Sequence, residues 1–599
     1  MSEPDITVAI EGLRKRFDAP DGKPFDAIDD ISLTVRAGEL TAFVGPDGAG
    51  KTTLMRMMAG LLRPDEGSLN VLGIDVRADP QSVQNRISYM PQRFGLYEDL
   101  SVQENLDLYA DLHGVPQEVR RERFGRMLEM TDMARFTDRP AGKLSGGMKQ
   151  KLGLACTLVR SPDLLLLDEP SVGVDPLSRR DLWKIIDQLI ADEQLSVIVS
   201  TAYMDEAERC GQIFVFHHGR ILADGPPDAL RKRAEGLGYV ADALPDRPAR
   251  VLQARLIDAP DRIIDAVPKG GDVHFIRRPQ CDEAALADLL SDTRVQPRDA
   301  ELEDAFMLLL REHENEPAQA ADDANTNKED GDRYGTAETA SPSAGERDGP
   351  VIVVRDLVRK FGDFTAVAST SFDVQRGEIF GLLGPNGAGK TTTFRMLCGL
   401  LPATSGHLEV AGVDLRTARA KARARIGYVS QKFALYGNLS VRENLEFFAG
   451  AYGLRGERKR ERVKAVIAQF DLDASAQSGI LPVGYKQRLA MAAGLLHEPD
   501  ILFLDEPTSG IDPLARRAFW RTITSLAQGG VTIIITTHFM EEAEYCDRIA
   551  IQDAGELLAL GTPAEVREQA GDDASDMNEA FIAIVEQNRA RQTNEKVAA

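Results

Sequence analysis

The sequence carries one glycine-rich motif twice, and this repeat limits the folds that the chain can adopt. The motif reads Gly-Pro-Asp-Gly-Ala-Gly-Lys-Thr at residues 45–52 and Gly-Pro-Asn-Gly-Ala-Gly-Lys-Thr at residues 384–391. A strand-like apolar run at 379–383 comes before the second copy, and a helix-like run at 392–397 follows it. Glycines let backbone amides turn inward around phosphate oxygens, and the new helix presents its positive N-terminal end. This context predicts a phosphate-binding loop rather than a glycine-rich turn of the same composition.

The landmarks downstream of the motif also repeat in the same order. The segment 87–92, ending in Tyr-Met-Pro-Gln, matches 426–431, and the segment 164–170, ending in Asp-Glu-Pro, matches 501–507. In the first half, Leu-Ser-Gly-Gly-Met lies between these landmarks at 144–148. Such long-period similarity indicates a structural unit written twice. We therefore expect two modules of one kind.

Composition limits the class of protein. At 599 residues the chain should form several domains, because single cores stop growing at about 250–300 residues. The 94 acidic and 71 basic residues give a net charge of −23, which argues against nucleic acid bound by the general surface. The 5 cysteines are scattered, so no disulfide framework, zinc site or iron–sulfur site is expected. With neither a signal peptide nor an apolar run of about 20 residues, we expect a cytosolic chain without a transmembrane segment.

The glycine-rich loops, Gln92 and Gln431, the 144–148 segment and the two Asp-Glu-Pro turns together resemble the nucleotide-binding domains of ABC ATPases. The resemblance covers residues 5–235 and 350–570. It implies an α/β fold of two P-loop NTPase modules, each with a RecA-like α/β core, an antiparallel β subdomain and a helical signature subdomain. It also implies that the chain hydrolyses ATP, with ATP and Mg²⁺ as cofactors.

The remaining residues are expected to form connections between the modules. The first segment after the first module, called the appendage, has weak strand-like and helical patterns and resembles the tails of ATPases of ABC-2-type exporters. The segment that follows it, called the linker, is acidic, aperiodic and rich in small residues, which predicts disorder. We expect a first ATPase domain at 1–235, a small α/β appendage at 236–311, a flexible acidic linker at 312–349, a second ATPase domain at 350–570 and a C-terminal tail at 571–599.

The expected ATP-binding residues come from the loops, the helices that follow them, the intact signature and one aromatic residue ahead of each loop. They are Gly45, Gly48, Gly50, Lys51, Thr52, Thr53, Gly384, Asn386, Gly387, Gly389, Lys390, Thr391, Thr392, Ser145, Gly146, Gly147, Phe17 and Phe361. The lysine of such a loop reaches the β- and γ-phosphates. Phe17 and Phe361 can stack on adenine or pack in the core, and both interpretations stay open. It also stays open whether Asp47, which matches Asn386, points away from the phosphates.

The resemblance implies six Mg²⁺ contacts: Thr52, Gln92, Asp168, Thr391, Gln431 and Asp505. Glu169 and Glu506 each follow an apolar strand and an aspartate, where the carboxylate can polarise an attacking water. His538 follows the next strand of the second half, and the expected catalytic residues are Glu506, His538, Lys390 and Glu169. Positioning and charge stabilisation dominate phosphoryl transfer, so these side chains must be held in place.

The two halves differ at two of these positions. The second signature reads Leu-Pro-Val-Gly-Tyr at 481–485, where proline lacks an amide hydrogen and valine adds a β-branched side chain. The first half has Ala202 where the second has His538. The family arrangement places each ATP between the loop of one half and the signature of the other, head to tail, so both defects fall on the first loop's site. We expect the second site to hydrolyse ATP and the first mainly to bind it, although the retained Glu169 argues against a complete loss.

The segments 204–208 (Met-Asp-Glu-Ala-Glu) and 540–544 (Met-Glu-Glu-Ala-Glu), with the appendage, resemble the ATPases of ABC-2-type drug exporters. This resemblance implies the energising subunit of an exporter whose ABC-2-type permeases are separate chains. Such a subunit lies at the cytoplasmic face of the membrane, with permease contacts expected near residues 93–115 and 432–455. The alternative is a soluble ribosome-associated or translation-type tandem ATPase. It is disfavoured because the linker is acidic and one signature is altered. DNA-repair and iron–sulfur recycling ATPases would need cysteine clusters that the sequence lacks.

Overall fold

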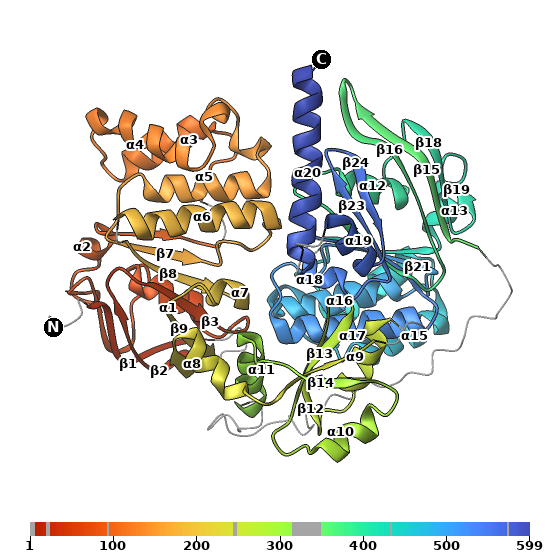
Figure 1. The fold of residues 1–599 in the computed structure, drawn as a ribbon, viewed down its shortest axis with the longest axis horizontal. Coiled ribbons are helices and arrows are strands. Elements are labelled where there is room, and N and C mark those ends of the chain that lie inside the picture. Colours follow the sequence, from red (N-terminus) through yellow and green to blue (C-terminus); the bar gives the residue numbers. More distant parts are fainter. Residues whose placement is uncertain are drawn as a thin grey trace. The chain divides into compact units, whose positions relative to one another are not determined.

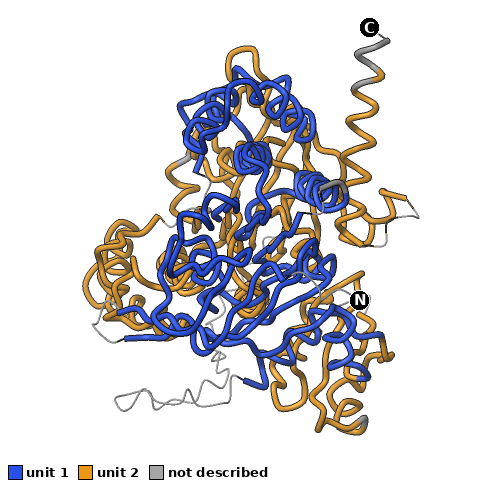
Figure 2. The backbone as a smooth tube through the Cα atoms, turned by 90° about the vertical axis from the view of Figure 1, so that its left-hand side faces the viewer, with its two compact units in different colours: residues 1–236, 299–317 blue, residues 237–298, 318–599 orange. Residues whose placement is uncertain are grey.

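The computed structural model describes residues 6–18, 24–92, 95–193, 195–243, 248–313, 349–431, 434–571, 574 and 576–598. These residues fall into two compact units, which Figure 2 distinguishes by colour. Unit 1 comprises residues 1–236 and 299–317, and unit 2 comprises residues 237–298 and 318–599. Most of the expected linker, residues 314–348, lies outside the described residues.

Unit 1 contains two sheets (Figure 1). The antiparallel sheet has the order β2-β1-β4-β5, with β1 (Ile6–Asp18), β2 (Pro24–Arg36), β4 (Glu66–Val71) and β5 (Ile74–Asp75). The six-stranded sheet has the order β10-β9-β3-β8-β7-β6, with β3 (Leu40–Val44), β6 (Ile87–Met90), β7 (Leu164–Asp168), β8 (Ser196–Thr201), β9 (Gln212–His217) and β10 (Arg220–Gly225). Its strands are parallel except for the β9–β10 pair. The strands β3, β7 and β8 are buried throughout, as expected of a parallel sheet covered on both faces.

The helices of unit 1 connect these strands and build a helical subdomain. They are α1 (Lys51–Met58), α2 (Pro80–Gln84), α3 (Val102–Leu112), α4 (Gln117–Met130), α5 (Gly146–Leu158), α6 (Pro176–Glu193), α7 (Met204–Ala207), α8 (Pro227–Arg231) and α11 (Leu302–His313). Helix α5 packs against α3, α4 and α6. The start of α3 is fixed by a capping box between Ser101 and Glu104, which satisfies two backbone amides at the helix end.

The second module, in unit 2, repeats this architecture. Its strands are β15 (Ile352–Phe361), β16 (Phe364–Val374), β17 (Ile379–Leu383), β18 (Ser405–Val410), β19 (Val413–Asp414), β20 (Ile426–Val429), β21 (Ile501–Asp505), β22 (Thr532–Thr537), β23 (Arg548–Asp553) and β24 (Glu556–Gly561). They form an antiparallel sheet of order β16-β15-β18-β19 and a six-stranded sheet of order β20-β21-β22-β17-β23-β24. The helices are α12 (Lys390–Leu397), α13 (Arg419–Arg423), α14 (Val441–Ala451), α15 (Gly456–Gln469), α16 (Val483–Leu495), α17 (Pro513–Gln528), α18 (Met540–Ala543), α19 (Pro563–Ala570) and α20 (Met577–Ala598).

Each module has a hydrophobic core between the antiparallel sheet and the face of the six-stranded sheet that carries the first helix. In unit 1 this core contains Val8, Phe43 and Leu54, all fully buried. Val354, Phe380 and Phe394 form the matching core in unit 2. Burial of such side chains contributes about 1.5–3 kcal/mol each. The core therefore fixes the loop between β3 and α1, and the loop between β17 and α12, from both sides.

The appendage is a four-stranded antiparallel sheet of order β12-β13-β11-β14 with two helices. Its elements are β11 (Gly238–Ala241), α9 (Ala249–Ile257), β12 (Ile263–Lys269), β13 (Asp272–Arg277), α10 (Glu283–Leu289) and β14 (Val295–Pro297). The appendage groups with unit 2, whereas α11 groups with unit 1 and packs on α8. The appendage expected from the sequence, residues 236–311, includes most of α11. In the structure α11 belongs to unit 1 instead, because its residues Leu302, Phe306 and Leu309 line a small apolar cavity with residues of the first module.

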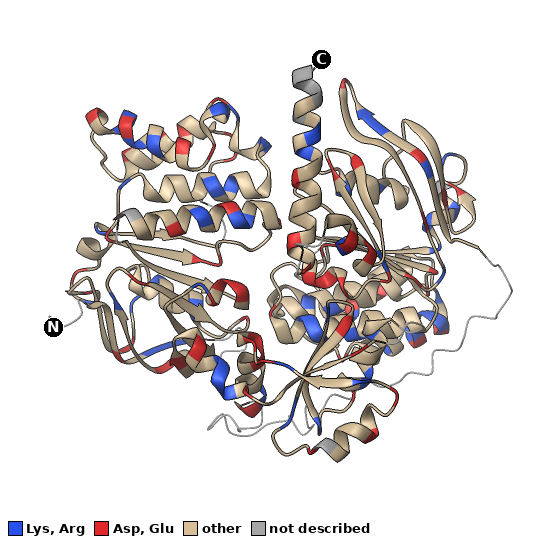
Figure 3. Cartoon of the chain, in the orientation of Figure 1, with Lys and Arg blue, Asp and Glu red and all other residues tan. Residues whose placement is uncertain are grey.

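The structure confirms the expected α/β fold of two matching modules, each with a six-stranded sheet, an antiparallel sheet and a helical subdomain. Acidic and basic residues are interspersed along the helices of each unit (Figure 3). Among the residues that the structure describes, none of the helices combines the length and apolar content that a membrane crossing requires.

Candidate functional site

Both glycine-rich loops connect a buried central strand to a helix. Gly50 has φ +103° and ends the loop as the N-cap of α1, and Gly389 has φ +102° at the start of α12. A Cβ on Gly50 would lie 2.6 Å from the carbonyl oxygen of Ala27, and one on Gly389 would lie 2.5 Å from that of Ala366. Both the left-handed backbone and the close contact require glycine. The two loops thus have the same local geometry.

The loop lysines are buried and held by carbonyl oxygens of their own loops. Lys51 is 4% exposed, and its Nζ donates to the oxygens of Gly45 and Pro46 at 2.6 and 3.1 Å. Lys390 makes the matching contacts, at 2.5 Å to Gly384 and 3.0 Å to Pro385. A buried ammonium group needs anionic or strongly polar partners. A buried cation beside a loop of glycines and a helix start fits the phosphates of a nucleotide.

The aspartate of each acidic pair ends a buried strand. Asp168 accepts hydrogen bonds from three hydroxyl groups: Thr52 Oγ1 at 3.0 Å, Ser200 Oγ at 2.6 Å and Tyr89 at 3.0 Å. Asp505 accepts one from Thr536 Oγ1 at 2.7 Å, and burial raises the pKa of Asp505. Carboxylate and hydroxyl oxygens are hard ligands of the kind that Mg²⁺ prefers.

Each site offers few protein ligands for Mg²⁺. Within the described residues, no group of three or more His, Cys, Asp or Glu side chains is arranged to bind a metal. An ion held by one carboxylate, one hydroxyl and the phosphates of a nucleotide needs no such group. The contact between Thr52 and Asp168 fits this arrangement.

The glutamate of each pair has a strained backbone held by the neighbouring strand. Glu169 has φ +49° and Glu506 has φ +45°, an unusual region for residues other than glycine. The amide of Glu169 donates to the carbonyl and the hydroxyl of Ser200, both at 3.0 Å. Thr536 holds the amide of Glu506 with the same two distances. Such conformations cost about 1–3 kcal/mol and persist where the surroundings enforce them.

Sequence reasoning missed Ser200 and Thr536. The signal was available, because both precede a threonine at the end of the strand after the acidic pair, and both halves keep a hydroxyl at that position.

Each predicted glutamine lies against the glutamate of its own module. Gln92 Nε2 donates to Glu169 Oε2 at 2.5 Å, and Gln431 Nε2 donates to Glu506 Oε2 at 2.6 Å. The structure therefore brings together the lysine, aspartate, glutamate and glutamine of each module.

The two sites differ beside the glutamate. His538 is 2% exposed and its Nδ1 lies 3.3 Å from Glu506 Oε2, without the alignment of a hydrogen bond. Burial raises the pKa of Glu506, but His538, Lys390 and Gln431 together outweigh burial, so the pKa lies below its ordinary value. At the first site, burial raises the pKa of Glu169 above its ordinary value, although Lys51, 3.7 Å away, opposes this.

The signature helices begin at matching residues but differ in their first turn. Ser145 caps α5 by accepting a hydrogen bond from the amide of Met148 at 3.3 Å. Pro482 occupies the same position of α16 and provides no side-chain cap. Val483 is 45% exposed at this helix start. The altered signature has therefore kept its helix and lost its polar cap.

The two aromatic residues ahead of the loops are not buried. Phe361 is 46% exposed, with the Arg359 guanidinium 4.4 Å from its ring centroid. Phe17 is half-buried, and its ring centroid lies 6.0 Å from that of Phe25. An exposed ring leaves a face open to a ligand, so Phe361 is not a core residue. Asp47 is exposed at the tip of the first loop.

Comparison with known proteins agrees with this geometry. The chain matches the family described as "ABC transporter" over residues 28–172 and 367–509. A shorter match, to "AAA domain, putative AbiEii toxin, Type IV TA system", covers residues 484–541 within the second module.

Two curated relatives and one solved structure illustrate the similarity. The chain is 47% identical over 588 residues to the probable multidrug ABC transporter ATP-binding protein YbhF of Escherichia coli, which covers 97% of this chain and 98% of that protein. It is 40% identical over 244 residues to the linearmycin resistance ATP-binding protein LnrL of Bacillus subtilis, covering 39% of this chain and 78% of that protein. A solved structure titled "Structure of ATP binding subunit of ABC transporter" is 28% identical with a TM-score of 0.35, covering 38% of this chain and 92% of that one.

Proposed function

We propose a division of labour between the two sites of this chain, which belongs to the ABC transporter ATP-binding proteins, a family that hydrolyses ATP. The second site, with Lys390, is the main hydrolytic site, and the first site, with Lys51, mainly binds ATP. The observation that carries this proposal is the contact between His538 and Glu506, since the first module has Ala202 where the second has His538. The exposed Pro482 and Val483 of the second signature support the same division.

At the second site, separate residues would bind the phosphates, hold Mg²⁺ and activate the attacking water. Lys390 and the amides of its loop bind the β- and γ-phosphates, while Thr391, Gln431 and Asp505 would hold Mg²⁺, which neutralises charge on the phosphate oxygens. Glu506 orients the attacking water and accepts its proton, which a carboxylate with a lowered pKa can do from its ionised state. His538 keeps Glu506 in place and supplies a donor near the developing charge.

The other half of each site comes from the partner module in this proposal. The two halves pair head to tail, so that Ser145, Gly146 and Gly147 close the second site and residues 481–485 close the first. The second site then has the full set of polar contacts. The first site keeps Lys51, Thr52 and Asp168 for binding, but it has lost two contacts to the transition state.

The fate of bound nucleotide tests this division. The full chain is incubated with labelled ATP and Mg²⁺, freed of unbound nucleotide and analysed for its bound nucleotides. We expect about one ATP to remain for each ADP formed, because only one site turns over. Conversion of all bound ATP to ADP within one turnover time would overturn the proposal.

We also propose that the chain energises an exporter whose permeases are separate membrane proteins, and that it acts at the cytoplasmic face of the membrane. The names of the relatives, a multidrug transporter and a linearmycin resistance protein, support export. The expected contact segments carry exposed apolar side chains: Tyr97 and Leu112 in the first module, and Tyr436 and Phe447 in the second. Exposed apolar patches of this kind commonly mark protein interfaces.

Co-purification tests the exporter proposal against the ribosome-associated alternative. We expect the native chain to sediment with membranes, and to lose this association when Leu112→Asp and Phe447→Asp are combined. The matched control is Glu129→Ala on α4, outside the proposed contact segments. Association with ribosomes that survives the combined change would favour the translation-type alternative.

A further inference from the structure

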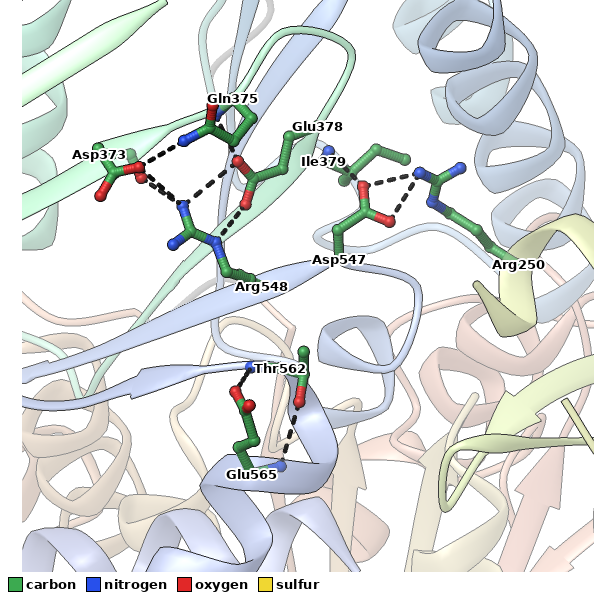
Figure 4. Close-up of polar contacts among 9 residues, drawn as sticks. All are labelled: Arg250, Asp373, Gln375, Glu378, Ile379, Asp547, Arg548, Thr562 and Glu565. Carbon is green, nitrogen blue, oxygen red and sulfur yellow. Dashed lines mark hydrogen bonds and ion pairs between the residues drawn. The ribbon is translucent and has the colours of Figure 1, made fainter. Parts of the chain in front are cut away.

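The appendage, defined here as residues 237–298, is anchored to the start of the second phosphate-loop strand. Arg250 on α9 is 7% exposed, and its Nη2 lies 2.7 Å from both carboxylate oxygens of Asp547. Asp547 also accepts a hydrogen bond from the amide of Ile379 at 2.8 Å (Figure 4). Ile379 begins β17, and the phosphate loop follows the last residue of this strand. A partly buried, charge-assisted bond therefore links the appendage, through Asp547, to the strand that carries the loop.

A second anchor holds α17. Asp265 of β12 and Arg517 of α17 are 4% and 6% exposed, and the Arg517 Nε lies 3.3 and 3.2 Å from the two carboxylate oxygens. Asp258, at the end of α9, accepts bonds from Arg521 at 2.8 and 2.6 Å. Helix α17 begins at Pro513, a short turn after Glu506. Both side chains of the Asp265–Arg517 pair are almost fully buried, so this contact restricts where α17 can lie.

A third anchor holds the helix that follows His538. The amide of Gly271, in the turn between β12 and β13, donates to Glu544 Oε2 at 3.2 Å. Glu544 is the C-cap residue that follows α18, and it also pairs with Arg567 at 2.5 Å. Helix α18 starts at Met540, next to the segment that carries His538. The appendage thus contacts three elements, and each of them leads into one part of the second site.

The first module lacks the first of these anchor residues. Gly211 matches Asp547, because Gly211 N donates to Leu40 O at 2.9 Å just as Asp547 N donates to Ile379 O at 2.9 Å. Glycine offers no carboxylate to an arginine. The contact with Arg250 is therefore specific to the second module. This is notable in sequence terms, because the residues on either side of the appendage, Gly236 and Asp299, both belong to unit 1.

We propose that the appendage is a positioning domain that holds β17, α17 and α18 in the arrangement that hydrolysis at the second site requires. Asp265 and Arg517 are positioning residues in this proposal, acting on the second site through α17. The proposal rests on the proposed function, because it takes the second site as the hydrolytic one.

Steady-state hydrolysis by the full chain tests the proposal, using Asp265→Ala, Arg517→Asp and the charge-reversed double variant Asp265→Arg with Arg517→Asp. We expect each single variant to lower kcat about 10-fold to 100-fold, because small displacements of catalytic groups cost rate, while the KM for ATP changes far less. We expect the reversed pair to recover part of the lost kcat. The matched control is Asp292→Asn, which breaks the Arg255–Asp292 pair inside the appendage and should leave kcat unchanged.

The results that oppose the proposal are equally specific. A wild-type kcat in a folded Asp265→Ala chain would overturn it, as would an equal fall in kcat for Asp292→Asn. If thermal unfolding shows that the single variants do not fold, Asp258→Asn is used instead, because it weakens the exposed contact between Asp258 and Arg521. A fall in kcat of less than about 10-fold in this variant would support the proposal. An unchanged kcat would oppose it. Failure of the proposed function is seen separately, as turnover that persists in Glu506→Gln.

Discussion

His538 Nδ1 lies 3.3 Å from Glu506 Oε2, and this contact distinguishes the second ATP site from the first. Ala202 stands at the matching position of the first module, and its methyl group offers no donor to Glu169. The two sites share the contacts of the lysine with its own loop, the bond from the glutamine to the glutamate, and the bond from a strand hydroxyl to the aspartate. An unequal division of hydrolysis therefore depends on few side chains, and single substitutions can test it.

We predict that His538→Ala lowers kcat about 100-fold to 1,000-fold, the usual cost of removing one preorganised donor near developing charge. Steady-state phosphate release measures this effect. Ala202→His serves as the matched control and should raise kcat little, because in the proposed pairing the altered residues 481–485 close the first site. A His538→Ala chain with nearly wild-type turnover would show that the histidine is dispensable.

We predict that Gly147→Ala destabilises the first module by about 1–3 kcal/mol through overpacking. A Cβ at Gly147 would lie 2.2 Å from Ser178 Oγ and 2.4 Å from Ser178 Cβ, so α5 and α6 would have to separate. The matching change Gly484→Ala places its Cβ 3.4 Å from Ala515 Cβ, an ordinary contact. Thermal unfolding should show a lower Tm for Gly147→Ala alone, and equal Tm values for the two variants would contradict this packing.

We predict that Thr391→Val raises the Mg²⁺ concentration needed for half-maximal turnover, since valine keeps the shape of threonine and removes its hydroxyl ligand. A titration with Mg²⁺ after chelation measures the shift, and turnover should vanish without the ion. Thr52→Val is the matched change at the first site and should alter the titration much less. The reverse order of effects would assign turnover to the first site.

Much of the fold and several of the site residues could be predicted, because each motif that indicates them is a short continuous segment of the sequence. The apolar runs before Asp168 and Asp505 predicted buried strands, and the glycine-rich loops predicted the strand-to-helix turns. The contacts of Ser200 and Thr536 with the acidic pairs were not predicted, because they depend on which strands become neighbours in the sheet.

The grouping of the appendage was beyond the sequence for a similar physical reason. The residues that dock it, such as Arg250 and Asp547, are far apart in the chain and look like ordinary surface charges until the fold buries them. Periodicity identifies the elements of such a segment but does not identify the surface on which they pack.

The most direct test of the division between the sites compares Glu506→Gln with Glu169→Gln in steady-state ATP hydrolysis, with the partner membrane proteins present. Both changes remove a carboxylate that accepts a bond from a glutamine, so they perturb matching surroundings. We predict that Glu506→Gln abolishes turnover and that Glu169→Gln retains much of it. Equal loss of turnover in the two variants would contradict the proposed division and show that the first site hydrolyses ATP as well.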